Sequence, residues 1–132
     1  MTVTDMLRAH PQAVADTDAV ARCIDECLRC TFTCTSCADA DLDEPDVQEL
    51  VVCIRRCLDC ADVCHATANV LARRTAFDPQ LGRAVVEACL RACRLCAEEC
   101  ERHAAHHEHC RLCAEECRRC EQACADLLGS IA

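Results

Sequence analysis

Residues 93–100 and residues 110–117 share the octapeptide CRLCAEEC, and the spacing in this repeated stretch organises the whole chain. Its cysteines are separated by steps of three and four residues. Such steps place side chains on one face of an α-helix, as the a and d positions of a heptad do. The octapeptide therefore predicts two helices, each with its cysteines in a single stripe.

The same spacing extends to all eighteen cysteines of the 132-residue chain, which fall into four groups. The groups are Cys23, Cys27, Cys30, Cys34 and Cys37; Cys53, Cys57, Cys60 and Cys64; Cys89, Cys93, Cys96 and Cys100; and Cys110, Cys113, Cys117, Cys120 and Cys124. Arg, Glu, Asp and Ala fill most of the positions between them. Cysteine thus occupies the positions where leucine lines an ordinary helical bundle.

Helix-breaking residues between the groups predict where the helices begin and end. Asp43-Glu44-Pro45 and Asp78-Pro79 are typical helix starts, with proline in the first turn. Short connections make successive helices antiparallel neighbours. The fold class is therefore all-α, an antiparallel four-helix bundle with a short N-terminal helix, in one domain of residues 1–132 whose core spans about 17–128. The four expected bundle helices are 17–41, 45–74, 79–104 and 107–128.

Composition and charge restrict the class of protein. Ala, Leu, Arg and Glu are good helix formers, and only two Gly and three Pro are present, unlike in loop-rich disulfide scaffolds. A net charge of −9 disfavours nucleic acid and anionic membrane surfaces as partners. We see no signal peptide and no apolar stretch of membrane-spanning length. We therefore expect a cytoplasmic protein, in which thiols stay reduced.

Antiparallel stacking of the helices brings the cysteines into layers across the bundle axis. Four layers contain one cysteine from each helix, and a fifth contains Cys23 and Cys124 opposite Thr67 and Val86. All eighteen cysteines are used in this arrangement. The four complete layers, in order along the axis, are Cys37, Cys53, Cys100 and Cys110; Cys34, Cys57, Cys96 and Cys113; Cys30, Cys60, Cys93 and Cys117; and Cys27, Cys64, Cys89 and Cys120.

Three interpretations of these cysteines compete. Cysteine can act as a small buried hydrophobe, but a core made wholly of thiols would be underpacked. Disulfides need converging Cβ vectors, which neighbours three or four residues apart on one helix supply poorly. Metal binding explains both the number of thiols and their alignment. We therefore predict that all eighteen cysteines are metal ligands.

The identity of the metal follows from softness and charge. Thiolates select Cu(I), zinc or iron–sulfur clusters. Zinc and iron–sulfur motifs usually include turns, Gly or Pro, whereas helical residues separate pairs such as Cys27 and Cys30. One monovalent ion per thiolate leaves a buried core neutral, but zinc with four thiolates leaves two negative charges. The sequence favours many Cu(I) ions; a zinc or cadmium buffer of metallothionein type and an iron–sulfur or redox protein are the alternatives.

The two ends of the predicted bundle differ in polarity. Beyond Cys23 and Cys124 come apolar residues: Val20, Leu71, Val85, Val86, Leu127 and Leu128. At the other end, the rhythm of threes and fours continues from Cys100 through His103 and His107, so we expect both histidines to face the axis and to bind or admit metal. His106 and His109 fall off this stripe and are expected to be solvated. His10 and His65 are not expected to be ligands, whereas Asp41 and Glu49 could assist a hydrated ion.

These features together resemble the cytosolic copper storage proteins over residues 17–128. The resemblance rests on C-x-x-x-C and C-x-x-C steps on four successive helices, followed by His103 and His107. The resemblance implies a four-helix bundle that fills with Cu(I) and assembles as a homotetramer. It also implies that two cysteines on one helix commonly bind one ion and that histidine contributes to binding at the open end. It extends to the eighteen cysteines and these two histidines, and leaves out Asp41, Glu49 and the N-terminal segment. Exported members carry a signal peptide and methionines at the open end, neither of which is seen here.

The expected function is cytosolic storage and detoxification of multiple Cu(I) ions, with a copper donor or acceptor as partner. The number of ions should be on the order of the number of thiols, which is typical of storage. No nucleophile with its base, phosphate loop or open catalytic metal site is apparent, so we do not expect an enzyme.

Overall fold

The computed structural model describes residues 1–131, which contain helices and no strand. The predicted all-α fold, a four-helix bundle with a short N-terminal helix, is confirmed. Over this part of the chain no helix combines the length and hydropathy needed to cross a membrane. The elements are α1 (Val3–Ala9), α2 (Thr17–Leu42), the 3-10 helix η1 (Val47–Leu50), α3 (Val51–Ala72), α4 (Pro79–His103) and α5 (Glu108–Ser130).

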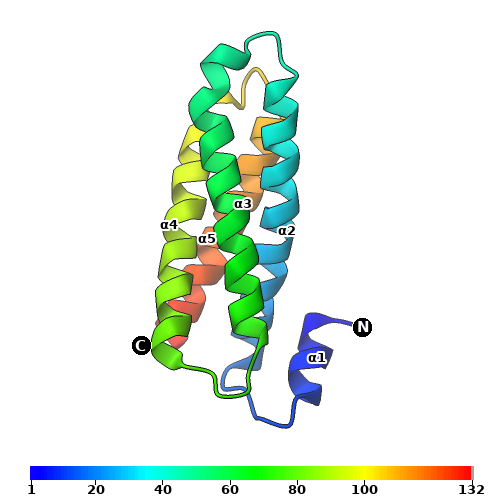
Figure 1. The fold of residues 1–132 in the computed structure, drawn as a ribbon, viewed down its shortest axis with the longest axis vertical. Helices are drawn as coiled ribbons and strands as arrows, with labels where there is room; N and C mark the ends of the chain where they lie inside the picture. The colour runs from blue at the N-terminus through cyan, green and yellow to red at the C-terminus, as the bar shows by residue number, and fades with distance from the viewer. Residues whose placement is uncertain (132) are drawn as a thin grey trace.

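Helices α2 to α5 run alternately up and down the long axis of the molecule (Figure 1). Helix α2 packs against α3 and α5, and α4 packs against the same two helices. The connections after α2 and after α4 lie together at one end, which we call the mouth. The α3–α4 connection and the end of α5 lie at the opposite, closed end, where α1 packs on the outside of α2 through its buried Leu7.

The helix boundaries follow the sequence signals except at the start of α3. Asp78 caps α4 as predicted, because its side chain accepts a hydrogen bond from the Leu81 backbone N–H at 3.0 Å. The predicted start at Pro45 is wrong, since η1 occupies Val47–Leu50 and α3 begins at Val51. The tighter 3-10 turn buries Leu50 completely beneath the mouth. Tertiary burial has therefore overridden the local proline signal.

Small side chains line the interior of the bundle along most of its length. All eighteen cysteines are buried, and buried alanines lie beside their stripes. Alanine and cysteine let helix backbones approach closely, because the side chains at a helix contact set the distance between the axes. The alanines concerned are Ala21, Ala38, Ala61, Ala68, Ala97, Ala114 and Ala123.

Larger apolar residues fill the closed end, as the sequence predicts. Val20, Leu71, Val86 and Leu127 are all buried there. Thr67 is fully buried among them, and its hydroxyl donates to the Val63 carbonyl at 2.7 Å. Burial of each large apolar side chain contributes about 1.5–3 kcal/mol, so this end stabilises the bundle without metal.

We expect the metal-free, reduced protein to be a folded helical bundle. Good helix formers, a capped α4 and the apolar closed end supply stability that zinc fingers obtain only from their metal. Far-UV circular dichroism with a chelator and a thiol reductant should show a helical spectrum and a cooperative thermal transition. Addition of Cu(I) should raise the transition temperature with little change in helicity, and a random-coil spectrum before addition would contradict this.

Candidate metal-binding core

The cysteine sulfurs form a column along the bundle axis. Within the predicted central layer, Cys30 Sγ lies 3.7 Å from Cys60 Sγ and 3.8 Å from Cys117 Sγ. Cys60 Sγ lies 3.8 Å from Cys93 Sγ, which completes the layer. All eighteen cysteines are free thiols in this structure. The central layer derived from antiparallel stacking is therefore present in space.

Contacts between layers are as short as those within them. Cys34 Sγ lies 3.7 Å from Cys30 Sγ on the same helix and 3.6 Å from Cys117 Sγ on the facing one. Cys60 and Cys64, also on one helix, have their sulfurs 3.8 Å apart. A metal ion bound at any layer would thus have the next set of thiols within one short step.

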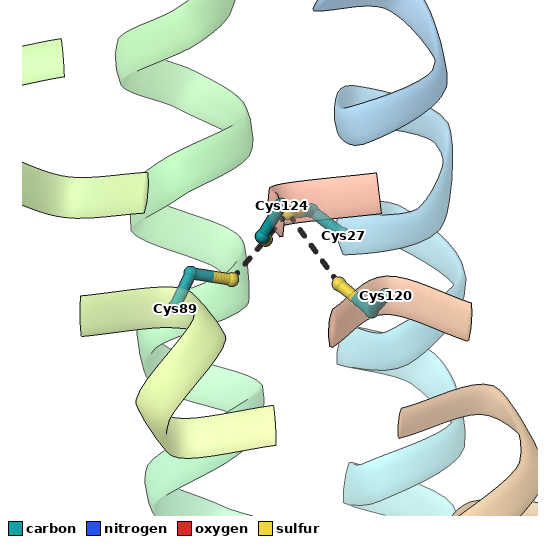
Figure 2. A group of neighbouring side chains, drawn as sticks. All are labelled: Cys27, Cys89, Cys120 and Cys124. Carbon is teal, nitrogen blue, oxygen red and sulfur yellow. Dashed lines mark hydrogen bonds between the residues drawn. The ribbon is translucent and has the colours of Figure 1, made fainter. Parts of the chain in front are cut away.

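Figure 2 shows one group of sulfurs near the closed end, contributed by three helices. Cys27 comes from α2, Cys89 from α4, and Cys120 and Cys124 from α5. The sulfur of Cys27 lies 3.7 Å from that of Cys89 and 3.8 Å from that of Cys120. All four sulfurs lie within 4.8 Å of one another. Their convergence allows two, three or four thiolates to bind a common ion.

Several sulfurs belong to more than one such group. Cys30, Cys34, Cys117 and Cys120 each take part in two groups whose sulfurs lie within 4.8 Å of one another. Separate tetrahedral zinc sites need four ligands of their own. Shared sulfurs suit thiolates that bridge neighbouring ions. The column is therefore better arranged for a connected cluster than for isolated sites.

Hydrogen bonds between neighbouring thiols shift their pKa values in opposite directions. Hydrogen bonding with Cys113, together with burial, raises the pKa of Cys117 well above its usual range. Hydrogen bonding with Cys117 lowers the pKa of Cys60. Because thiolates bind metal and thiols do not, loading must release protons from the column.

The fifth layer lies where the sequence places it. Cys23 Sγ and Cys124 Sγ are 3.8 Å apart, and the hydrogen bond with Cys124 lowers the pKa of Cys23 to about 5. Thr67 and Val86 occupy the positions opposite and are fully buried. The column of sulfurs therefore ends against the apolar residues of the closed end.

At the mouth, the two histidines predicted as ligands contact carboxylates. His103 Nε2 lies 2.9 Å from Glu99 Oε2. His107 Nδ1 lies 2.8 Å from Glu44 Oε2, and His107 Nε2 lies 2.9 Å from Asp46 Oδ2. The hydrogen bond with Asp46 raises the pKa of His107. Neither ring makes a hydrogen bond to a cysteine in the described part of the chain. Ligation by these two residues therefore stays a prediction.

A break in the helix explains the position of His107. The rhythm of threes and fours, extended across the predicted break between residues 104 and 107, treats Cys100 to Cys110 as one helix. Helix α4 ends at His103, and His107 occupies the N-cap position of α5 without a capping hydrogen bond from its side chain. The turn between them directs the His107 ring towards the loop that follows α2.

His109 is the histidine that the structure brings to the thiols, and the prediction that it is solvated is wrong. Its Nδ1 atom lies 3.5 Å from Cys37 Sγ and 3.6 Å from Cys110 Sγ. His109 lies in the first turn of α5, beside the cysteine stripe, and its side chain reaches α2 across the mouth. Its position next to Cys110 is the one sequence signal that could have indicated this contact. His106, by contrast, is exposed as expected.

Of the two acidic residues considered at the mouth, only Asp41 enters the core. Asp41 is fully buried; its Oδ1 accepts a hydrogen bond from the Cys110 thiol at 3.5 Å and lies 3.5 Å from His109 Nδ1. Burial raises the pKa of Asp41 to about 7. Glu49 is exposed on η1.

The remaining histidines lie away from the sulfurs. His65 is exposed on the outer face of α3. His10 Nδ1 accepts a hydrogen bond from the Gln12 backbone N–H at 2.9 Å in the segment after α1. That neither residue is a ligand stays a prediction.

Comparisons with known proteins identify the family. The family model described as copper storage protein matches residues 16–129. The structure of the copper storage protein Ccsp from Streptomyces lividans, loaded with 10 copper equivalents, is 56% identical, with a TM-score of 0.96, over 98% of this chain and 99% of that one. A second solved structure is that of a cytosolic copper storage protein from Streptomyces lividans during copper loading, with five coppers. Its chain is 60% identical to this one, with a TM-score of 0.84, and the match covers 85% of this chain and 93% of that one.

A search of curated proteins gave no match. The family model covers most of the chain, including every cysteine, and the similarity to the Streptomyces lividans protein extends over nearly the full length of both chains. These matches favour copper over the zinc, cadmium and iron–sulfur alternatives. This chain belongs to the copper storage protein family.

Proposed function

We propose that this protein stores and detoxifies Cu(I) in the cytosol by binding many ions to the thiolates of its bundle core. The observation that carries the proposal is the column of eighteen buried sulfurs, in which neighbours lie 3.6–4.0 Å apart from Cys53 and Cys100 behind the mouth to Cys27 and Cys89 near the closed end. A column of this kind offers many similar metal-binding positions and no single specialised metal site. That arrangement suits storage.

Charge supports Cu(I) as the stored ion. A buried thiolate without a counter-charge is costly, and the column lies where water is excluded. One Cu(I) per thiolate makes the core neutral, whereas zinc held by four thiolates leaves two negative charges at each site. Sulfurs that belong to two groups, such as Cys30 and Cys117, can bridge Cu(I) ions.

The similar protein from Streptomyces lividans supports the cytosolic location and a high capacity. That protein is described as cytosolic and has been loaded with five and with 10 copper equivalents. This chain has eighteen cysteines in the column, so its capacity should be on the order of eighteen ions if Cu(I) and thiolate bind about one to one. We propose storage without a catalytic activity, in one domain made by the whole chain.

We propose that copper enters and leaves through the mouth. The closed end is filled by Val86, Leu127 and their apolar neighbours, which offer no ligand. The mouth carries imidazoles and carboxylates, and soft thiolates lie directly behind them. A cytosolic donor or acceptor that exchanges Cu(I) would therefore meet the protein at this end.

We further propose that the chain assembles as a homotetramer, as the resemblance implies. The exposed apolar side chains of Leu28 and Phe32 on α2 and Leu112 on α5 support this. Phe32 and Leu112 line the same groove, whose volume is about 310 Å³. Contiguous exposed apolar residues commonly mark interfaces between protein chains.

Removal of one layer tests the storage function. Anaerobic titration of the reduced protein with Cu(I), against a chromophoric competitor, should saturate near one ion per thiol. The quadruple alanine variant of Cys30, Cys60, Cys93 and Cys117 should bind roughly four ions fewer, because each Cu(I) neutralises about one thiolate. The equivalent variant of Cys27, Cys64, Cys89 and Cys120 serves as a matched control and should lose the same number. Unchanged capacity in both variants would show that these thiols are not ligands.

Replacement of His103 and His107 by Ala tests the route through the mouth. Uptake from a Cu(I) donor and removal by a chelator, followed by stopped-flow absorbance, should both slow several-fold, since an exchangeable nitrogen ligand is lost. Capacity should fall by about one or two ions at most, because thiolates hold Cu(I) more firmly. The exposed His65 and His106, changed together to Ala, provide the control. Rates equal to those of this control would exclude His103 and His107 from the route.

Phe32→Asp tests the assembly. A carboxylate in place of the exposed Phe32 ring should be too costly to bury between subunits, so the variant should dissociate to smaller species. Light scattering coupled to size-exclusion chromatography measures the mass directly. Phe77→Leu changes a residue in the α3–α4 connection at the closed end, away from Phe32, and should keep the mass of the parent. A tetrameric Phe32→Asp variant would place the interface elsewhere, and a monomeric parent would remove the tetramer.

A further inference from the structure

The carboxylate of Glu44 lies between two histidines at the mouth. Its Oε2 atom is 2.8 Å from His109 Nε2 and 2.8 Å from His107 Nδ1. Glu44 belongs to the loop after α2, whereas both histidines belong to the start of α5. One side chain thus joins the two connections that form the mouth.

This contact determines which nitrogen of His109 carries the hydrogen. A carboxylate only accepts hydrogen bonds, so the short contact of 2.8 Å with Glu44 places the hydrogen of the neutral imidazole on Nε2. Asp41 Oδ1 lies farther from Nδ1, at 3.5 Å, and already accepts a hydrogen bond from the Cys110 thiol. Nδ1 then keeps its lone pair. Because Nδ1 lies 3.5 Å from Cys37 Sγ and 3.6 Å from Cys110 Sγ, that lone pair is available beside the outermost thiols of the column.

We propose that Glu44 is a positioning residue for copper loading: its hydrogen bond with His109 Nε2 keeps Nδ1 free to bind Cu(I) together with Cys37 and Cys110. Histidines that bind metals commonly donate their other ring N–H to a carboxylate, which fixes the tautomer and increases the basicity of the ligating nitrogen. The inference rests on the proposed storage function, because it concerns the first ions to enter the column.

His109, and not His107, is the residue through which Glu44 acts. Both ring nitrogens of His107 lie within hydrogen-bond distance of carboxylates, Nδ1 2.8 Å from Glu44 and Nε2 2.9 Å from Asp46. His109 Nδ1 is 3.5 Å from Asp41 Oδ1 and equally close to Cys37 Sγ. His109 alone of the pair directs a nitrogen at sulfur. The two rings are stacked with their centroids 5.4 Å apart, so His107 supports the His109 ring from one side.

Loading kinetics of matched variants test the proposal. Glu44→Ala should slow uptake of the first few ions from a chelating Cu(I) donor about 10-fold or more, the range found when such an outer hydrogen-bond partner is lost. Glu44→Gln, which keeps an acceptor without the charge, should fall between Glu44→Ala and the parent. Glu49→Ala, an exposed glutamate on the adjacent η1, removes the same charge and should load like the parent. Total capacity should change by about one ion at most.

A double variant and the state of the imidazole separate positioning from a general effect of charge. In a His109→Ala background, Glu44→Ala should cause no further slowing. Long-range 15N–1H NMR of the metal-free protein labelled in histidine should show the Nε2–H tautomer of His109 in the parent and its loss in Glu44→Ala.

Each outcome decides between the two proposals. A parent that takes up only a few ions would overturn the storage function itself. A parent that fills normally, with Glu44→Ala indistinguishable from Glu49→Ala, would overturn only the role of Glu44. Further slowing in the His109→Ala background, or an unchanged tautomer in Glu44→Ala, would also overturn it, because Glu44 would then act without His109.

Discussion

The contact between sulfur atoms of four different helices is the constraint on which the rest of this structure depends. A sulfur can approach sulfurs of two neighbouring helices only if the backbones lie close together, and buried alanines such as Ala61 and Ala97 permit that approach. The same sulfur must also lie within reach of the next layer, as Cys34 does with Cys30. Alternating steps of three and four residues meet both requirements on a straight helix.

In this core, the residues that stabilise the fold and the residues that bind metal occupy different segments of the bundle axis. Thiols pack less volume than leucine, so the cysteine layers contribute less apolar burial than an ordinary core would. Large apolar residues are concentrated beyond the last layer, where Leu71 and Leu127 close the bundle. The cysteine column can therefore lose protons and gain metal ions while the apolar closed end keeps the helices packed together.

Polarity at the mouth complements the charge of the cargo. Asp41 is buried against Cys110 and His109, and its pKa of about 7 reflects the cost of a carboxylate held away from water. A monovalent cation nearby would lower that cost. Glu44 and Asp46 add two further carboxylates at the mouth, one on each side of the His107 ring.

The sequence by itself determined the helices, their pairing and the layers of cysteine, because these depend on local periodicity and on short connections. The apolar closed end followed from the same rhythm. Tertiary structure alone decided the arrangement of the mouth. Glu44 and His109 are 65 residues apart in sequence and meet only when α2 packs against α5. The turn after His103 also interrupts the rhythm, so periodicity favoured His107 over His109, and packing across the bundle decided which imidazole faces sulfur.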